Sequence, residues 1–216
     1  MKRIAVLASG RGSNFEAIAR AVKSGKIPAD LPVLITDNRN AKAIERAEKL
    51  GINWIFVDPT SFPDRETYDA KIVAILKHLN VDLVCLAGYR KIVTSVFIKA
   101  FPMKILNIHP ALLPSFPGLK AQEKAIRYGV KVSGATVHFV DEGVDTGPIV
   151  VQAVVPVSPE DTPETLSEKI LSFEHRIYPQ AIKWFVEGRI KVSGRNVIVE
   201  NADYSKLPAV PALEDF

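Results

Sequence analysis

The first half of the chain alternates short apolar runs with amphipathic stretches, and this alternation constrains the fold more than any other feature. The run RIAVLAS (3–9) is apolar and nearly uninterrupted, which is typical of a strand buried on both faces. The predicted strands are 3–9, 32–37, 52–58, 81–88 and 103–109, and the predicted helices are 15–25, 41–51 and 64–80. This order predicts an α/β, Rossmann-like fold, with a mostly parallel twisted sheet and helices on both faces.

The second half predicts a shorter set of elements that ends in a C-terminal β-hairpin. A capping signal, SPEDTPETLSEKI, opens the last helix, which we expect to end near Glu187. The other predicted elements are a helix at 121–128, strands at 132–140 and 148–157, a hairpin at 189–200 and an irregular tail at 207–216. No linker interrupts the chain, so we expect one functional domain over 1–188, with the hairpin and tail of 189–216 packed on it.

Composition and charge narrow the class of partner. The net charge is +4, and the basic residues are scattered, which permits an anionic small-molecule substrate but forms no stripe for nucleic acid. No apolar stretch is long enough to span a membrane, and the N-terminus reaches glycine too soon for a signal peptide. The single cysteine, Cys85, excludes an internal disulfide. We therefore expect a cytoplasmic protein, either a monomer or a homodimer, that binds small molecules and neither nucleic acid nor a membrane.

A glycine-rich turn, ASGRGSN (8–14), joins the first predicted strand to the first predicted helix. Backbone N–H groups and the helix dipole can hold an anion at such a place. The turn lacks the third glycine of a dinucleotide fingerprint, because Phe15 stands there, and no Walker lysine follows. Two interpretations remain: a tight turn in which Ser13 or Asn14 caps the helix, or a cradle in which Gly12, Ser13 and Asn14 bind a phosphomonoester.

The exit of the fifth predicted strand combines an amide and an imidazole. Asn107 and His109 lie two residues apart, so they share one face of a strand. Polar groups at the carboxyl end of a parallel strand face the crevice where α/β sheets bind ligands. The other histidines are weaker candidates: His78 falls on a polar helix face, and His138 is expected to be a hydrogen-bonded core group or a support for the site.

Asp145 lies in a turn-rich acidic loop, VDEGVDTG (140–147), where two glycines can hold it pointing inward. A carboxylate beside His109 would favour the imidazolium and fix the ring orientation. The trio of Asn107, His109 and Asp145 suits transfer of an acyl group to an amine supplied by the substrate. The amide and imidazolium would donate to the oxygen of a tetrahedral intermediate, while His109 and Asp145 would handle the proton of the amine. No zinc-type spacing is present, so we expect no metal.

Two stretches carry a family resemblance: NIHPALLPSFPG (107–118) and GATVHFVDEGVDTGPIVVQ (134–152). They resemble the formyltransferases that use 10-formyltetrahydrofolate as co-substrate. VLASGRGSNFEAI (6–18) and EHRIYPQAIKWFVEGRI (174–190) are similar to the branch that formylates the amine of 5-phosphoribosylglycinamide in de novo purine biosynthesis. The similarity covers nearly the whole chain.

The resemblance implies a role for each matching residue. Asn107, His109 and Asp145 would be catalytic, with Asp145 raising the pKa of His109. Gly12, Ser13 and Asn14 would hold the substrate phosphate, and Glu174 its ribose hydroxyls, although a glutamate on a helix is more often a surface charge. The residues implied to bind folate are Arg65, Arg90, Lys91, Ile92, Val93 and Asn107.

The folate segment departs from the common family pattern. Arg90 stands where relatives often have Met, and Lys91 where they often have Arg, so the clamp on the folate carboxylate is weaker or shifted by one residue. Ile92 and Val93 would help to line an apolar slot for the rings. The stretch GLKAQ (118–122) replaces one that contains histidines in many relatives, which leaves the contribution of that loop open.

Several alternatives stay open. A formyltetrahydrofolate hydrolase would use water as acceptor, and it resembles a chain with an additional N-terminal domain, whereas this sequence starts at its first strand. Methionyl-tRNA formyltransferase adds a C-terminal barrel, for which little chain remains after residue 188. A sugar-nucleotide formyltransferase would need a uridine pocket. A non-catalytic nucleotide-binding module would explain the glycine turn but not the Asn–His pair.

Overall fold

A computed structural model describes residues 1–214, in which the chain divides into two compact units. The first unit comprises Met1–Asn107 and Val140–Glu142, and the second comprises Ile108–Phe139 and the residues from Gly143 onward. The predicted domain boundary at residue 188 does not coincide with this division, and it stays a prediction.

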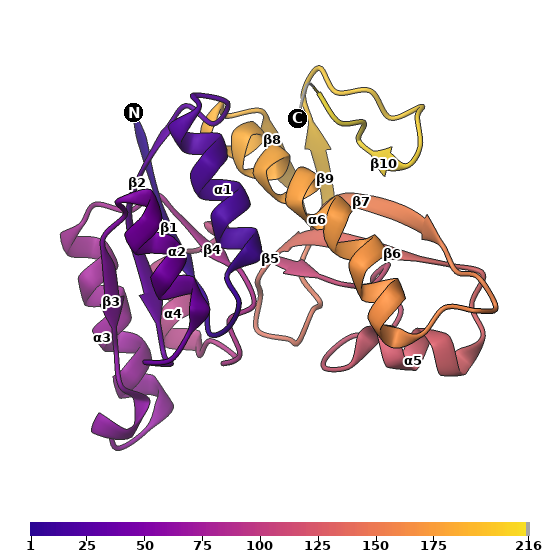
Figure 1. The fold of residues 1–216 in the computed structure, drawn as a ribbon. Coiled ribbons are helices and arrows are strands. Elements are labelled where there is room, and N and C mark those ends of the chain that lie inside the picture. The colour runs from indigo at the N-terminus through magenta and orange to yellow at the C-terminus, as the bar shows by residue number, and fades with distance from the viewer. Residues whose placement is uncertain (215–216) are drawn as a thin grey trace. The chain divides into compact units, whose positions relative to one another are not determined.

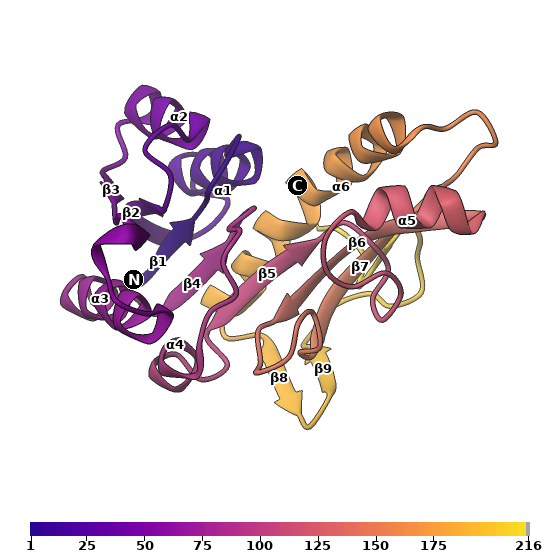
Figure 2. The same cartoon turned by 90° about the horizontal axis from the view of Figure 1, so that it is seen from below.

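The first unit is built on a parallel sheet. Its strands are β1 (Lys2–Leu7), β2 (Ala29–Thr36), β3 (Trp54–Phe56), β4 (Leu83–Leu86) and the first part of β5 (Ile105–His109), paired in the order β5-β4-β1-β2-β3. Its helices are α1 (Ser13–Lys23), α2 (Lys42–Leu50), α3 (Arg65–His78) and α4 (Ser95–Ala100), with a short 3₁₀ turn at Pro59–Ser61. Figure 2 shows α1 and α2 on one face of this sheet and α3 and α4 on the other. The predicted α/β class and parallel sheet are confirmed.

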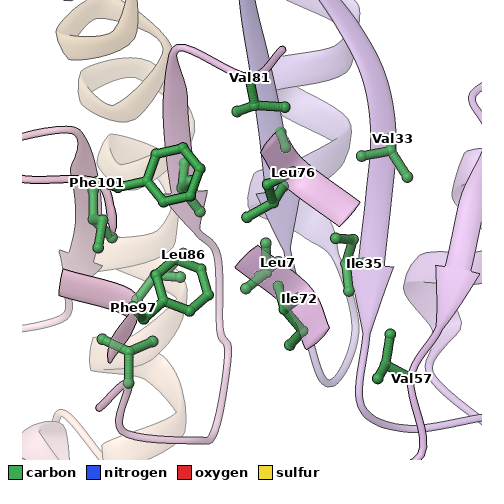
Figure 3. Close-up of a cluster of buried hydrophobic side chains, with 14 of the residues drawn as sticks. Leu7, Val33, Ile35, Val57, Ile72, Leu76, Val81, Leu86, Phe97 and Phe101 are labelled. Atoms are coloured by element: carbon green, nitrogen blue, oxygen red, sulfur yellow. The ribbon is translucent and has the colours of Figure 1, made fainter. Parts of the chain in front are cut away.

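An apolar core of the first unit lies between the sheet and its helices α3 and α4. Leu7 of β1 and Ile35 of β2 pack with Ile72 of α3, while Phe97 of α4 extends the same cluster (Figure 3). The other face of β1 is buried too, since Ile4 and Val6 have no exposed surface. Burial on both faces explains why this strand reads as a continuous apolar run.

The second unit combines an antiparallel sheet with two helices. Strands β6 (Val132–Phe139) and β7 (Ile149–Pro156) pair antiparallel, while α5 (Ala121–Tyr128) packs against α6 (Pro163–Val186), which covers both strands (Figure 1). The predicted hairpin is present as β8 (Ile190–Ser193) and β9 (Asn196–Val199). Among residues 1–214, no helix combines the length and apolarity that crossing a membrane requires.

Sequence reasoning missed three short elements. Helix α4 has only six residues, too few to display a helical period, and the 3₁₀ turn has three. The tail was predicted to be irregular, and this is wrong at Ala209–Val210, which form β10 and pair with β7. Because this strand is two residues long and lies between Pro208 and Pro211, it leaves no alternating pattern. The last two residues of that tail lie outside the described part of the chain.

Candidate active site

His109 and Asp145 meet, as the sequence predicted. His109 ends β5, and Asp145 lies in the loop between β6 and β7 with a left-handed backbone (φ 55°). The imidazole Nδ1 is 3.4 Å from the carboxylate Oδ2, and only 6% and 11% of the two side chains are exposed. This places a buried imidazole beside a buried carboxylate.

Asp145 is held by further groups of the second unit. The backbone N–H of Gly118 donates to its Oδ2 (2.7 Å), and Nε2 of His138 lies 3.6 Å from its Oδ1. Arg195, at the tip of the β8–β9 hairpin, donates to the carbonyl of the adjacent Thr146 (2.9 Å). Burial raises the pKa of Asp145, but hydrogen bonds from His138 and Gly118 and the charge of His109 outweigh it and hold the pKa at about 2. The carboxylate is therefore ionised at neutral pH.

The proton on His109 is located by its second contact. Nε2 lies 2.8 Å from the carbonyl oxygen of Phe116, which can only accept, so Nε2 carries the proton and Nδ1 faces Asp145. Burial lowers the pKa of His109 and outweighs the Phe116 carbonyl and Asp145, which both raise it. The implied effect of Asp145 thus has the predicted sign, but the net shift of the pKa is downward. Burial of the whole ring is the reason.

His138 was expected to be a hydrogen-bonded core group or a support for the site, and it is a buried, hydrogen-bonded group beside Asp145. Its side chain is buried, and Nδ1 lies 2.9 Å from the carbonyl of Phe139, so Nδ1 donates and Nε2 faces Asp145. The Asp145 carboxylate therefore lies between two imidazoles. The apolar pattern of β6 predicted that His138 is buried. Its contact with Asp145 could not be predicted, because it depends on the conformation of the loop between β6 and β7. His78 is exposed on α3, as predicted.

Asn107 is partly buried in β5, two residues before His109. Strand alternation puts both side chains on the same face of β5. The boundary between the two units falls just after Asn107. Its participation in the site stays a prediction.

The glycine turn of the first unit opens α1 at Ser13. Gly12 is the N-cap with φ 73°, and its carbonyl accepts from the N–H of Glu16 (2.9 Å). The interpretation in which Ser13 or Asn14 caps the helix is wrong, because the left-handed turn at Gly12 makes both of them helical residues. A Cβ on Gly12 would lie 2.6 Å from the Cβ of Ala43, so only glycine fits.

The turn and its surroundings suit an anion. The N–H of Ala43 donates to the Gly10 carbonyl (3.1 Å), and Nε of Arg46 donates to the Arg11 carbonyl (2.8 Å). Residues of α2 therefore bind these two carbonyl oxygens of the turn. Gly12, the N-cap residue, has no side chain that could cap α1. This is the arrangement in which helix N–H groups bind phosphate.

Glu174, on α6 of the second unit, is only 7% exposed. A solvated surface charge, the ordinary interpretation of a helix glutamate, does not describe it. Its role in binding the ribose stays a prediction.

Four of the implied folate residues, 90–93, follow one another between β4 and α4 of the first unit, whereas Arg65 lies on α3 and Asn107 on β5. The Ile92 side chain is 56% exposed, while Lys91 Nζ lies 5.6 Å above the Tyr68 ring. Arg65 donates through Nη2 to the Ile92 carbonyl (2.5 Å), and the Arg90 N–H donates to the hydroxyl of Ser9 (2.9 Å). An exposed apolar side chain in a segment that also carries Arg90 and Lys91 suits aromatic rings that end in carboxylates.

Val93 differs from the expectation. Its side chain is 6% exposed and belongs to the core cluster behind the sheet, so it supports the segment and does not line a slot for folate rings. Within residues 1–214, no group of three or more His, Cys, Asp or Glu side chains could hold a metal ion.

The chain has a parallel α/β sheet with a His–Asp pair at the carboxyl end of β5. This arrangement is typical of enzymes that place general acid–base groups where a strand ends. The chain belongs to the formyl transferase family, whose model matches residues 2–182.

Individual relatives agree with this. The phosphoribosylglycinamide formyltransferase of Bacillus subtilis is 44% identical over 183 residues, which cover 85% of this chain and 94% of that protein. The structure of glycinamide ribonucleotide transformylase 1 from Symbiobacterium toebii is similar with a TM-score of 0.91 and 50% identity, covering 92% of this chain and 94% of that one. The trifunctional purine biosynthetic protein adenosine-3 of Drosophila melanogaster is 42% identical over 194 residues, but the matched part is only 14% of its length.

Proposed function

We propose that the protein transfers the formyl group of 10-formyltetrahydrofolate to the amine of 5-phosphoribosylglycinamide, a step of purine biosynthesis. The observation that carries the proposal is the buried His109–Asp145 pair, with 3.4 Å between Nδ1 and Oδ2. Family membership and the names of the full-length bacterial relatives support the same reaction. We further propose that residues 1–188 act as one catalytic domain, with the hairpin and tail packed on it.

The chemistry requires a donor at the formyl oxygen and a group that controls the amine proton. The co-substrate supplies a formyl carbon bound to nitrogen, and attack by the amine drives negative charge onto the formyl oxygen. Nε2–H of His109 and the amide of Asn107 donate to that oxygen. One such donor is worth roughly 10²–10³ in rate. Asp145, which is ionised at neutral pH, favours protonation of the imidazole as negative charge develops on the formyl oxygen, and it receives the amine proton, directly or through water. The tetrahedral intermediate then collapses: the bond between the formyl carbon and the folate nitrogen breaks, and that nitrogen takes up the proton and leaves as tetrahydrofolate.

The contact between His109 and Phe116 defines what must change on substrate binding. Nε2–H, the group proposed to meet the formyl oxygen, donates to the Phe116 carbonyl at 2.8 Å. The N–H of Gly118, two residues further along, donates to Asp145. The same loop therefore satisfies both members of the pair. Catalysis requires that the formyl oxygen replaces the Phe116 carbonyl.

Each of the two substrates has its own set of proposed binding residues. Gly12, Ser13 and Asn14 bind the phosphate through the N-terminus of α1, and the buried Glu174 binds ribose hydroxyls. Arg90, Lys91, Ile92 and the backbone of Val93 bind the folate, with Asn107 near its formyl group. Arg65 shares the segment, and its guanidinium is already bound to the Ile92 carbonyl.

The remaining features of the proposal are coarser. We place the enzyme in the cytoplasm, as a monomer or homodimer that acts on small molecules, without nucleic acid, membrane or metal. These points rest on composition and on the family.

One experiment separates this reaction from its alternatives. The purified protein is incubated with 10-formyltetrahydrofolate, with and without 5-phosphoribosylglycinamide, and tetrahydrofolate release is measured. Release only in the presence of the nucleotide supports transfer. Release without it would indicate a hydrolase, and calorimetric binding of the nucleotide with no turnover would indicate a binding module.

A further inference from the structure

Tyr89–Thr94, the segment proposed to bind folate, is held at three points by one face of α3. The segment joins β4 to α4 without regular secondary structure, so its own backbone does not fix its shape. Arg65, Tyr68 and Asp69 supply the three contacts, and their spacing of i, i+3 and i+4 puts them on the same face of α3.

The first two contacts act at Tyr89 and Ile92 of the segment. Arg65 Nη2 donates to the Ile92 carbonyl at 2.5 Å, and the Tyr89 hydroxyl donates to the Tyr68 hydroxyl at 3.2 Å. Burial raises the pKa of Tyr68 to about 12, so its hydroxyl stays protonated at neutral pH. These contacts fix the backbone at Ile92 and the side chain of Tyr89.

The third contact is the most buried. Asp69 is only 2% exposed, and its Oδ2 accepts from both the N–H (2.6 Å) and the hydroxyl (2.8 Å) of Thr94. Thr94 is the N-cap of α4, yet its hydroxyl makes no capping bond to that helix. A threonine at this position ordinarily caps its own helix. Here the hydroxyl is used for a contact with a residue 25 positions away.

The position of this contact links it to the ligand segment. Thr94 follows Val93, which is anchored in the core, and Ile92, which is turned outward. A displacement of Thr94 would also move Val93 and Ile92, because the three residues are consecutive in the chain. Groups that bind a ligand must be held within about 0.5 Å of their productive positions. The residues that support these groups set that precision.

We propose that Asp69 is a positioning residue for the folate co-substrate, acting through Thr94 on the backbone of residues 90–93. The proposal rests on the proposed function. Asp69 does not touch the folate; it fixes the segment before binding, so that no binding energy is spent on ordering it.

The test compares the two substrates of the same reaction. Asp69→Ala removes the acceptor and leaves the Thr94 N–H without its partner, so KM for 10-formyltetrahydrofolate should rise about 10-fold or more. Thr94→Val removes one of the two bonds and should raise this KM about 3- to 10-fold. KM for 5-phosphoribosylglycinamide and kcat at saturating folate should stay within about twofold of the original protein, since no bond to either reacting group is lost. Calorimetry with tetrahydrofolate should give the same ratios for its dissociation constant.

Conservative variants should restore binding. Asp69→Asn keeps an oxygen that can accept both bonds, and Thr94→Ser keeps both donors. Each should bring KM for the folate back to within about threefold of the original value, because each keeps both bonds. Should Asp69→Ala fail to fold, the pair of Thr94 variants decides the question alone.

Asp64 provides a matched control on the same helix. It accepts from the N–H (2.7 Å) and hydroxyl (2.6 Å) of Thr67, the same pair of bonds, but it is exposed and caps α3. Asp64→Ala should lower the melting temperature without changing the ratio of the two KM values. An equal rise of the folate KM in Asp64→Ala, or a parallel rise of both KM values in Thr94→Val, overturns the proposal in favour of a purely structural role.

The failure of the proposed function looks different. An original protein that neither binds tetrahydrofolate nor transfers the formyl group contradicts the function and this inference together. An active protein in which Thr94→Val leaves the folate KM unchanged contradicts only the assignment of Asp69.

Discussion

The proposed binding elements of the first unit and the proposed catalytic pair of the second depend on different physical properties. The glycine turn and the Tyr89–Thr94 segment of the first unit use backbone conformation, with Gly12 in a left-handed state and carbonyls held by Arg46 and Arg65. The pair in the second unit uses buried charge, with one carboxylate between two imidazoles. The first kind of site is sensitive to shape and the second to protonation.

This difference between the two regions predicts different effects for substitutions in each of them. Changes in the glycine turn should affect folding and substrate affinity together, because backbone shape serves both. Changes at the catalytic pair should affect turnover with little loss of affinity, because the buried groups act on the reacting atoms. The following substitutions test whether the two regions separate in this way.

His109→Ala should give the largest effect. It removes the imidazole proposed to donate to the formyl oxygen, and kcat should fall by about 10³. The KM for 5-phosphoribosylglycinamide should change little, because the phosphate and ribose contacts remain. The measurement is steady-state kinetics beside His78→Ala, an exposed histidine of α3. Near-normal turnover in His109→Ala would remove His109 from the mechanism.

Gly12→Ala should give the next largest effect, on stability and affinity together. A Cβ would lie 2.6 Å from the Cβ of Ala43 and 2.7 Å from its Cα, and an alanine at φ 73° is itself strained. The combined cost is about 3 kcal/mol of unfolding free energy. Denaturant unfolding and nucleotide calorimetry measure the two effects. Gly25→Ala, also at positive φ but with open space around its Cβ, should show the conformational strain alone.

These two regions also differ in how far the sequence predicted them. The apolar run of β1 and the bounds of α5 were readable because burial and helical period leave direct patterns. The meeting of His109 with Asp145 followed from residue types at a strand exit and a turn-rich loop. His109 and Asp145 could be identified from the sequence because polar side chains are unusual at the end of a buried strand and in the loop that leads into another buried strand.

The groups that hold the site were not predictable in the same way. Asp69 on a helix looks like an ordinary surface acid, and its contact with Thr94 exists only because α3 packs beside the Tyr89–Thr94 segment. The net pKa of His109 was likewise hidden, because burial of the ring depends on the whole fold. Val93 was assigned to the folate slot because its neighbours belong there, whereas the core cluster takes its side chain.

The pH dependence of stability probes the charge in the second unit. The pKa of Asp145 is about 2 in the folded protein, against an ordinary value of 3.8, so its stabilisation is present above pH 3.8 and is lost as the pH falls toward 2. The lost stabilisation amounts to about 2 kcal/mol. Denaturant unfolding at pH 4.5 and pH 2.5 should show a larger loss in the original protein than in Asp145→Asn. Asp161 and Asp203, whose pKa values are also about 2, titrate in both proteins and cancel. Equal losses in both proteins would contradict the charge contact.

Arg195→Ala should give the smallest effect, and it tests whether the catalytic loop also depends on shape. Arg195 donates to the Thr146 carbonyl at 2.9 Å from the hairpin tip, next to the left-handed Asp145. Losing one exposed hydrogen bond is worth about 1 kcal/mol at most, so kcat should fall about threefold with both KM values unchanged. Lys191→Ala, on the same hairpin, should leave kcat as it is, since its Nζ contacts the Gly188 carbonyl and Glu200, away from the loop. A rise in the nucleotide KM with unchanged kcat would contradict this role, because the hairpin would then act on substrate binding and not on the position of the carboxylate.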